Sequence, residues 1–198
     1  MSNTNQKIRK LTANGLLAAV ICIVSFLPLR TMGLEITFSM VPVAIGACLF
    51  GPSSGAILGA VFGTVSFLQC FGYSVFGTAL LEMNFFYTLL ICIPTRAAAG
   101  FLAGLLAKAL KKVCKTNLLG YTAGCIAAPV LNTVFFMSAI CLFFYNTDYI
   151  RGFAQLLGSN NVFTFILLFV GINGLVEIIA GFIIALPVSK ALSKAIKV

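Results

Sequence analysis

Apolar residues dominate six long stretches of the chain, and short polar or glycine-rich segments separate these stretches. A helix of roughly 20 apolar residues is long enough to cross the hydrocarbon core of a bilayer. The pattern therefore predicts an all-α membrane protein, a six-transmembrane-helix bundle that forms a single integral membrane domain over residues 1–198. The expected spans are approximately residues 8–29, 36–50, 54–69, 78–110, 118–145 and 162–192.

The composition supports the same class of protein, because 61% of the residues are hydrophobic and only 9% are charged. A soluble domain usually carries about 25% charged residues. A water-soluble chain of this size also has too much surface to hide so many apolar side chains. The first span is followed by further apolar spans and lacks a small-residue cleavage site after it. We therefore do not expect it to be a signal peptide.

Basic residues gather in three segments: the N-terminal segment, the loop after the fourth span and the C-terminal segment. With six spans, all three segments fall on one side of the membrane, and lysine and arginine are enriched in cytoplasmic loops. Both termini are therefore predicted to be cytoplasmic, and the net charge of +9 is mainly a signal of topology. Ten of the 13 basic residues lie in these segments: Lys7, Arg9, Lys10, Lys108, Lys111, Lys112, Lys115, Lys190, Lys194 and Lys197.

Several polar side chains fall at membrane depth, where they are costly and usually face an interior cavity. Two interpretations of Arg96 and Glu177 stay open: an internal ion pair that joins two helices, or the floor of a small-molecule pocket open to the outside. Apolar walls are expected from Phe135, Phe136 and Phe169, since ligand pockets are mostly apolar with a few placed polar groups. The candidate substrate-binding residues are Asn84, Tyr87, Arg96, Asn132, Asn173 and Glu177.

Small residues recur at intervals of four, as in Gly55, Gly59 and Gly63. This spacing lets helix backbones approach closely in a membrane, which predicts a compact bundle. Gly15 and Ala19 form a similar pair on the first span. Because that pair gives the helix a smooth face near its predicted cytoplasmic end, we expect it to dock a partner helix.

The residues that most enzymes and metal sites need are missing from the sequence. It has no histidine and no C-x-x-C pair among its seven cysteines, so no metal site is expected. There is no Walker A loop and no spacing typical of a nucleophile with its base. We therefore predict a protein that is not an enzyme and has no cofactor of its own. Two other classes of protein stay open as alternatives: a structural membrane adaptor and an intramembrane enzyme.

Five stretches of the sequence, taken in order, resemble one family. They are "LTANGLLAAV", "LEITFSMVPVAIGACLFGPSSGAILGAVFGTVSF", "IPTRAAAGFLAGLLAKALKK", "LNTVFFM" and "NGLVEIIAGFIIALPVSKAL". Together they are similar to the S components, the substrate-capture subunits of energy-coupling factor (ECF) vitamin transporters. The first stretch resembles the family's alanine-x-x-x-alanine motif, with Gly15 in place of the first alanine. Since glycine is also small, docking through this motif is still expected.

The resemblance implies a protein of the bacterial cytoplasmic membrane with six helices, which binds one vitamin from outside. It also implies a transmembrane coupling protein, which the first helix contacts, and two cytosolic ATPase subunits that use the ATP. Delivery of the vitamin would involve toppling of the S component in the membrane.

The substrate is predicted from two short pieces, "PTR" and "LNT", which look like the branch that handles pantothenate and riboflavin. An arginine fork suits a carboxylate, so pantothenate is our first expectation and riboflavin or another vitamin the alternative. Residues 70–77 and 146–161 could close over the pocket or could be plain connectors, and the sequence leaves both open.

Overall fold

The computed structural model describes residues 3–27, 30–31, 34–35, 38–114, 117–159 and 161–196. Within these residues the chain is mainly helical, with a two-residue antiparallel ribbon after the first helix. The elements are α1 (Asn3–Ser25), β1 (Arg30–Thr31), β2 (Leu34–Glu35), α2 (Met40–Phe50), α3 (Pro52–Gln69), α4 (Val75–Met83), α5 (Phe85–Cys114), α6 (Asn117–Phe144), α7 (Asp148–Leu156), α8 (Val162–Ala180), the π-helical turn η1 (Gly181–Ala185) and α9 (Leu186–Ile196).

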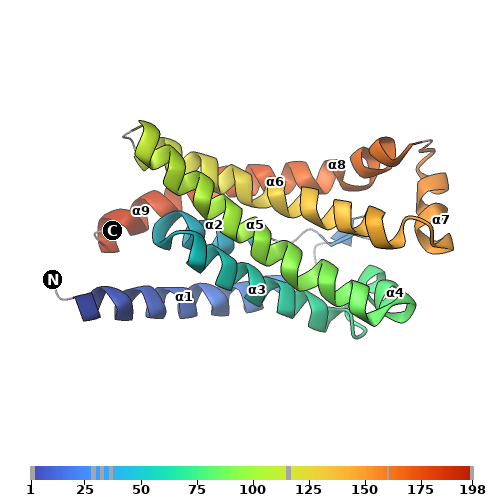
Figure 1. Cartoon of the computed structure of the whole chain (residues 1–198), viewed down its shortest axis with the longest axis horizontal. Coiled ribbons are helices and arrows are strands. Elements are labelled where there is room, and N and C mark those ends of the chain that lie inside the picture. Colours follow the sequence, from blue (N-terminus) through green and yellow to red (C-terminus); the bar gives the residue numbers. More distant parts are fainter. Residues whose placement is uncertain are drawn as a thin grey trace.

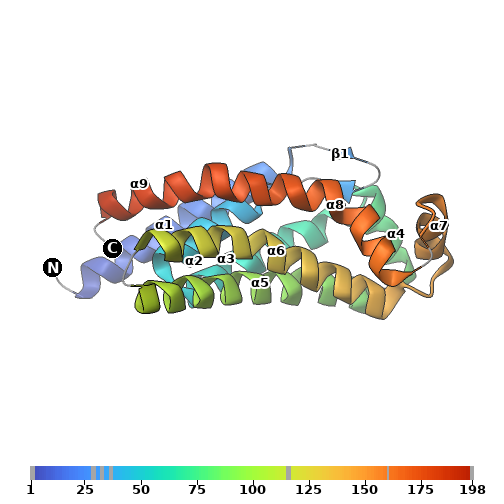
Figure 2. The same cartoon turned by 90° about the horizontal axis from the view of Figure 1, so that it is seen from above.

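The long helices lie along one common direction and form an elongated bundle (Figure 1). The start of α1 and the end of α9 lie at one end of this bundle, whereas α4 and α7 lie at the other end. Figure 2 shows the same arrangement from above, with α8, η1 and α9 running as one long rod beside α6. The two chain ends therefore share one end of the molecule, and two short helices cover the opposite end.

Four helical segments of the described chain are long and apolar enough to cross a membrane: Lys7–Ser25, Phe85–Val113, Leu118–Phe144 and Gly174–Ser193. Two shorter helical segments, Met40–Phe50 and Val162–Gly171, are also apolar. The helical prediction is thus confirmed, and the chain has several helices of membrane-spanning character.

One expected span is broken in the structure. The prediction of one helix over residues 78–110 was wrong, because the chain leaves the helical conformation at Asn84 (φ −160°, ψ 111°) between α4 and α5. The Asn84 side chain accepts a hydrogen bond from the Tyr87 backbone N–H at 3.1 Å. Asparagine is among the best residues for capping a helix start, so a new helix begins here inside an apolar run.

Two further boundaries differ from the sequence prediction. The segment expected to span residues 36–50 is helical from Met40, and residues 36 and 37 lie outside the described residues. The connector at 146–161 contains the helix α7, whose side chains separate into apolar and polar faces. A helix of nine residues is hard to predict from sequence, because it has room for only a few repeats of the apolar spacing that marks one helix face.

A tight seam joins α3 to α5. A Cβ atom at Gly55, Gly59 or Gly63 would overlap a backbone carbonyl of α5, at Gly100, Arg96 and Cys92 respectively. Because glycine has no side chain, the two backbones touch directly along three successive turns. The compact bundle expected from the glycine spacing is confirmed here.

Two lysine side chains donate hydrogen bonds to carbonyls at the C-terminal end of α2. Lys111 Nζ donates to the Cys48 carbonyl at 2.7 Å and lies 3.9 Å from the centre of the Tyr121 ring. Lys10 Nζ donates to the Phe50 carbonyl at 3.2 Å. The last carbonyls of a helix lack partners within it, and positive charge there is favourable. These two lysines therefore help to stabilise the fold.

Candidate ligand-binding site

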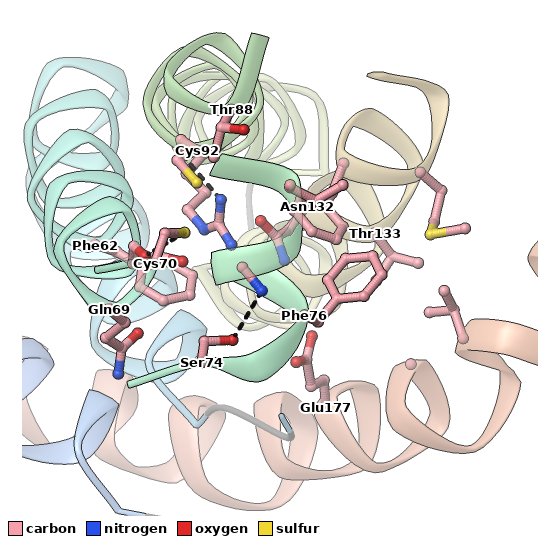
Figure 3. Close-up of a pocket in the computed structure, with 18 residues that line it drawn as sticks. Phe62, Gln69, Cys70, Ser74, Phe76, Thr88, Cys92, Asn132, Thr133 and Glu177 are labelled. Carbon is pink, nitrogen blue, oxygen red and sulfur yellow. Dashed lines mark hydrogen bonds between the residues drawn. The ribbon is translucent and has the colours of Figure 1, made fainter. Parts of the chain in front are cut away.

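A cavity of about 110 Å³ lies in the half of the bundle away from the chain termini. One water needs roughly 10–15 Å³ of such space, so the cavity has room for a small organic molecule. Helices α3, α4, α5, α6 and α8 surround it (Figure 3). Its lining residues are Phe62, Ser66, Gln69, Cys70, Ser74, Phe76, Gly77, Leu80, Thr88, Cys92, Arg96, Asn132, Thr133, Phe136, Met137, Val170, Gly174 and Glu177.

Arg96 comes from the middle of α5 and is only 7% exposed. In helices, long side chains point back toward the helix start, and here that direction leads into the cavity. The Arg96 Nη1 atom donates to the Cys92 carbonyl at 3.0 Å and to the Ile91 carbonyl at 3.4 Å. The guanidinium group thus donates hydrogen bonds to carbonyls of its own helix, about one turn before Arg96.

Two aromatic rings hold the guanidinium group of Arg96. Its Cζ atom lies 4.8 Å from the centre of the Phe62 ring on α3 and 5.1 Å from that of Phe136 on α6. Both distances are within the range of a cation–π interaction, which is strongest away from water. The two rings fix the orientation of the guanidinium group. Its Nε–H donor has no hydrogen-bond partner among the described residues.

Asn132 enters the cavity from α6 and is 8% exposed. Its amide is directed toward the space between α5 and α8 in Figure 3. Glu177 reaches the same cavity from α8, across from the α5 residues Thr88 and Cys92. The structure thus brings together three of the six candidate residues: a cation, an amide and a carboxylate. Their contact with a ligand stays a prediction.

Two further candidates, Asn84 and Tyr87, are not among the residues that line the cavity. Asn84 caps the start of α5, and the Tyr87 ring stacks on Phe143 at 4.7 Å between centres. Neither residue lines the cavity, because each is used in the packing where α4 meets α5 and α6. A ligand contact at either residue stays a prediction. The side chain of Asn173 lies outside the described residues.

Sequence reasoning missed most of the cavity wall on α5. Thr88, Cys92 and Arg96 follow one another at intervals of four and all line the cavity. Residues four apart share one face of a helix, so this spacing could have identified the two smaller residues once Arg96 was chosen. Of the expected aromatic walls, only Phe136 lines the cavity, whereas Phe135 and Phe169 pack in the apolar cores on either side of it.

An aromatic cluster lies at the end of the cavity next to α4 and α7. Phe76 of α4 lines the cavity, and its ring centre is 6.1 Å from Tyr149 and 6.2 Å from Phe153, both on α7. The Phe76 ring also lies 5.5 Å from Phe169 on α8. Burial raises the pKa of the Tyr149 phenol, so it stays neutral within this cluster. Helix α7 thus rests on a residue that lines the cavity, without lining it itself.

Most of the chain matches the model of one protein family. A family model described as "ECF transporter, substrate-specific component" matches residues 9–189. The chain belongs to this family. It is a family of transporter components and not of enzymes.

Two solved structures share the fold of this substrate-specific component. One is ThiT from Listeria monocytogenes, with a TM-score of 0.68 and 18% sequence identity over 96% of this chain and 98% of that chain. The other is the S-component for biotin from an ECF-type ABC transporter, with a TM-score of 0.61 and 20% identity over 98% of this chain and 95% of that chain. At these identities the likeness concerns the fold. No curated protein matches the chain by sequence.

The candidate docking face of this substrate-specific component is open. Gly15 and Ala19 are both exposed on α1, and a Cβ atom added at Gly15 would meet nothing within 4 Å. Close helix packing within the chain therefore does not explain the glycine at this position, in contrast to the glycines of the α3–α5 seam. A role of this face in docking stays a prediction.

Proposed function

We propose that this chain is the substrate-capture subunit of an ECF-type ABC importer. It binds a vitamin from outside the cell and delivers it inward together with a transmembrane coupling protein and two cytosolic ATPase subunits. Membership of the family supports the class. The observation that carries the ligand-binding role is a buried arginine, an amide and a carboxylate that line one cavity in the half of the bundle away from the termini.

The proposed setting is the bacterial cytoplasmic membrane, with both termini cytoplasmic. Six spans would be formed by α1, α2, α3, α5, α6 and the continuous rod of α8, η1 and α9. The end of the bundle that holds the termini carries exposed basic residues on three helices, among them Lys7, Lys112 and Lys190. Positive charge is enriched on the cytoplasmic side, so the cavity half would face outward.

Pantothenate is the first candidate for the ligand. Its carboxylate could meet the guanidinium edge of Arg96, and an arginine fork is well suited to this group. Its hydroxyl and amide groups would then lie toward Asn132 and Glu177, across the cavity. In this orientation the ligand carboxylate meets Arg96 from α5, whereas Glu177 enters the cavity from α8, across from Thr88 and Cys92.

Riboflavin is the second candidate, and the aromatic walls of the cavity favour it. Phe62, Phe76 and Phe136 line the cavity and could pack on a flat ring system. Riboflavin has no carboxylate for Arg96, however, so it would leave the buried cation without an ionic partner.

The first test is calorimetry on the purified protein in detergent with pantothenate and with riboflavin. Saturable one-to-one binding of pantothenate is the expected result. Riboflavin binding alone would replace the first candidate by the second. Failure of both vitamins, and of a mixture of other water-soluble vitamins, would contradict a capture role.

The second test separates capture from delivery. The double variant Gly15→Leu, Ala19→Leu places bulky side chains on the proposed docking face of α1. We expect unchanged vitamin binding but strongly reduced uptake in cells that also express the coupling protein and the ATPases. Val20→Leu, exposed on a different face of the same helix, is the control and should leave uptake unchanged. Equal uptake by all three proteins would refute docking through this face.

A further inference from the structure

Two cysteine thiols meet in the wall of the cavity. Cys70 directly follows the last residue of α3, Cys92 lies on α5, and both residues line the cavity (Figure 3). Each is 4% exposed, and together with Phe67 they form one small buried cluster. Their side chains interact with each other, and both carry a reduced thiol. The structure therefore holds a close pair of thiols beside a space that small molecules can occupy.

The position of Cys70 at the end of a helix leaves room for a small movement. It is followed by a turn that contains Gly72 (φ 109°), and the neighbouring side chain of Phe71 is exposed. A disulfide needs its two sulfur atoms at about 2.05 Å and its Cβ atoms at roughly 3.5–4.5 Å. Thiols that already interact reach this geometry by rotation of the side chains and a small shift of the backbone. The turn after Cys70 can take up such a shift, because α3 ends there.

Cys92 has the surroundings of a reactive thiol. The Arg96 Nη1 atom donates to the Cys92 carbonyl at 3.0 Å, which places a guanidinium group beside this residue. Reactive cysteines occupy electropositive and accessible surroundings, and the thiolate is the form that attacks. Cysteines that respond to oxidants often have a second cysteine next to them that resolves the first product. In this pair Cys92 is the attacking thiol and Cys70 the resolving one.

We propose that Cys70 and Cys92 form a peroxide-sensitive modification site that closes into a disulfide in the cavity wall. The Cys92 thiolate attacks one oxygen of hydrogen peroxide, the O–O bond breaks, and hydroxide leaves behind a sulfenic acid. The Cys70 thiolate then attacks the Cys92 sulfur, the S–O bond breaks, and a second hydroxide leaves as the S–S bond forms. The protons of the two thiols convert the two hydroxides to water. One peroxide is thus reduced by two electrons while the thiol pair is oxidised by two, and the bridge fixes the end of α3 to α5.

A second pair of cysteines provides a matched comparison within the chain. The Sγ atoms of Cys48 on α2 and Cys125 on α6 are 3.9 Å apart, and the two residues are 3% and 0% exposed. Both belong to an apolar core cluster, and neither lines the cavity. Structural cysteines that are buried in this way are inert. The two pairs therefore share close thiols but differ in their access to a cavity.

The test treats the full-length purified protein in detergent with hydrogen peroxide, without any vitamin. Catalase stops the reaction, N-ethylmaleimide blocks the remaining thiols in denaturant, and unreduced peptides are mapped by mass spectrometry. In wild type we expect the peptides of Cys70 and Cys92 to be joined, with a mass about 2 Da below the sum of the two reduced peptides. Dithiothreitol should separate them again. Cys48 and Cys125 should both carry N-ethylmaleimide.

Two variants check the order of the steps. Cys70→Ser removes the resolving thiol and should leave a sulfenic acid on Cys92, which dimedone labels. Cys92→Ser should give neither a joined peptide nor a dimedone label on Cys70. Absence of the Cys70–Cys92 bridge in wild type, or equal bridging of Cys48 with Cys125, would overturn the inference. Because each readout is a mass of the chain itself, the inference and the proposed vitamin binding can fail independently of each other.

Discussion

The two sides of α5 differ in how they meet the rest of the bundle. Toward α3, glycines bring the two backbones into contact, and there is no room for even one methyl group. Toward α6 and α8, the same helix lines a cavity with polar side chains. Arg96 takes part in both, because its carbonyl touches Gly59 in the seam while its guanidinium group enters the cavity.

This difference shows how a binding site can be held firmly in a membrane bundle. The seam fixes the α5 backbone from which the Arg96 side chain extends, and close packing transmits small shifts. The cavity contributes little to stability, since it contains a buried charge and unpaired polar atoms. The account therefore predicts that seam variants lose the fold, whereas cavity variants lose the ligand.

The largest effect is expected in the seam. Gly59→Ala would place a methyl group on the Arg96 carbonyl, and backbone atoms cannot move aside as a flexible side chain can. We expect a loss of about 2–3 kcal/mol of stability, seen as a lower melting temperature and poor yield in detergent. The control is Gly171→Ala on α8, where an added Cβ atom meets nothing within 4 Å. A Gly59→Ala protein as stable as this control would remove the distinction between the two sides of α5.

The next effect is expected in the cavity, at Arg96. Arg96→Ala should weaken pantothenate binding by about 100-fold, because a hydrogen bond to a charged group contributes roughly 1.5–3 kcal/mol. The melting temperature without ligand should change little, since the lost contacts to the Cys92 and Ile91 carbonyls are balanced by removal of a buried charge. Calorimetry and thermal unfolding of the same samples measure both quantities.

Arg96→Lys sharpens this prediction. Lysine keeps the charge but loses the planar fork, so we expect an intermediate loss of about 10-fold. If Arg96→Ala binds pantothenate as wild type does, Arg96 has no role in capture, and its hydrogen bonds to α5 are its whole function.

A smaller effect is expected at the end of the bundle that holds the termini. Lys111→Met removes the hydrogen bond to the Cys48 carbonyl and the contact with the Tyr121 ring. We expect a loss of about 1 kcal/mol of stability with unchanged ligand affinity, measured by thermal unfolding and calorimetry. Lys112→Met, an exposed neighbour, should be neutral in both. A loss of ligand affinity in Lys111→Met would mean that the two halves of the bundle are coupled.

The sequence predicted the seam better than the cavity. Glycines at intervals of four directly indicate close helix contact, and Gly55, Gly59 and Gly63 all lie in the seam. Arg96 and Asn132 each lie near the middle of an apolar run, and this position alone predicted that both line one cavity. In these cases a local pattern determines the position, because a helix converts spacing along the chain into a shared face.

The errors arose where one residue changes the path of the chain. Asn84 ends α4 and caps α5, but its surroundings are apolar on both sides, so the break is hidden in a hydrophobic run. Tyr87, three residues after this break, stacks on Phe143 and is not among the residues that line the cavity. The contribution of Phe76 could not be predicted, because it depends on how α4 and α7 fold over the end of the bundle.

The most direct test of the central claim, that a vitamin binds in this cavity, is native mass spectrometry with the cavity filled by a side chain. Gly174 lines the cavity, and Gly171 on the same helix does not. After incubation with pantothenate, wild type and Gly171→Leu should each carry one bound ligand, and Gly174→Leu should carry none while keeping a wild-type melting temperature. A ligand retained in full by Gly174→Leu would contradict the account.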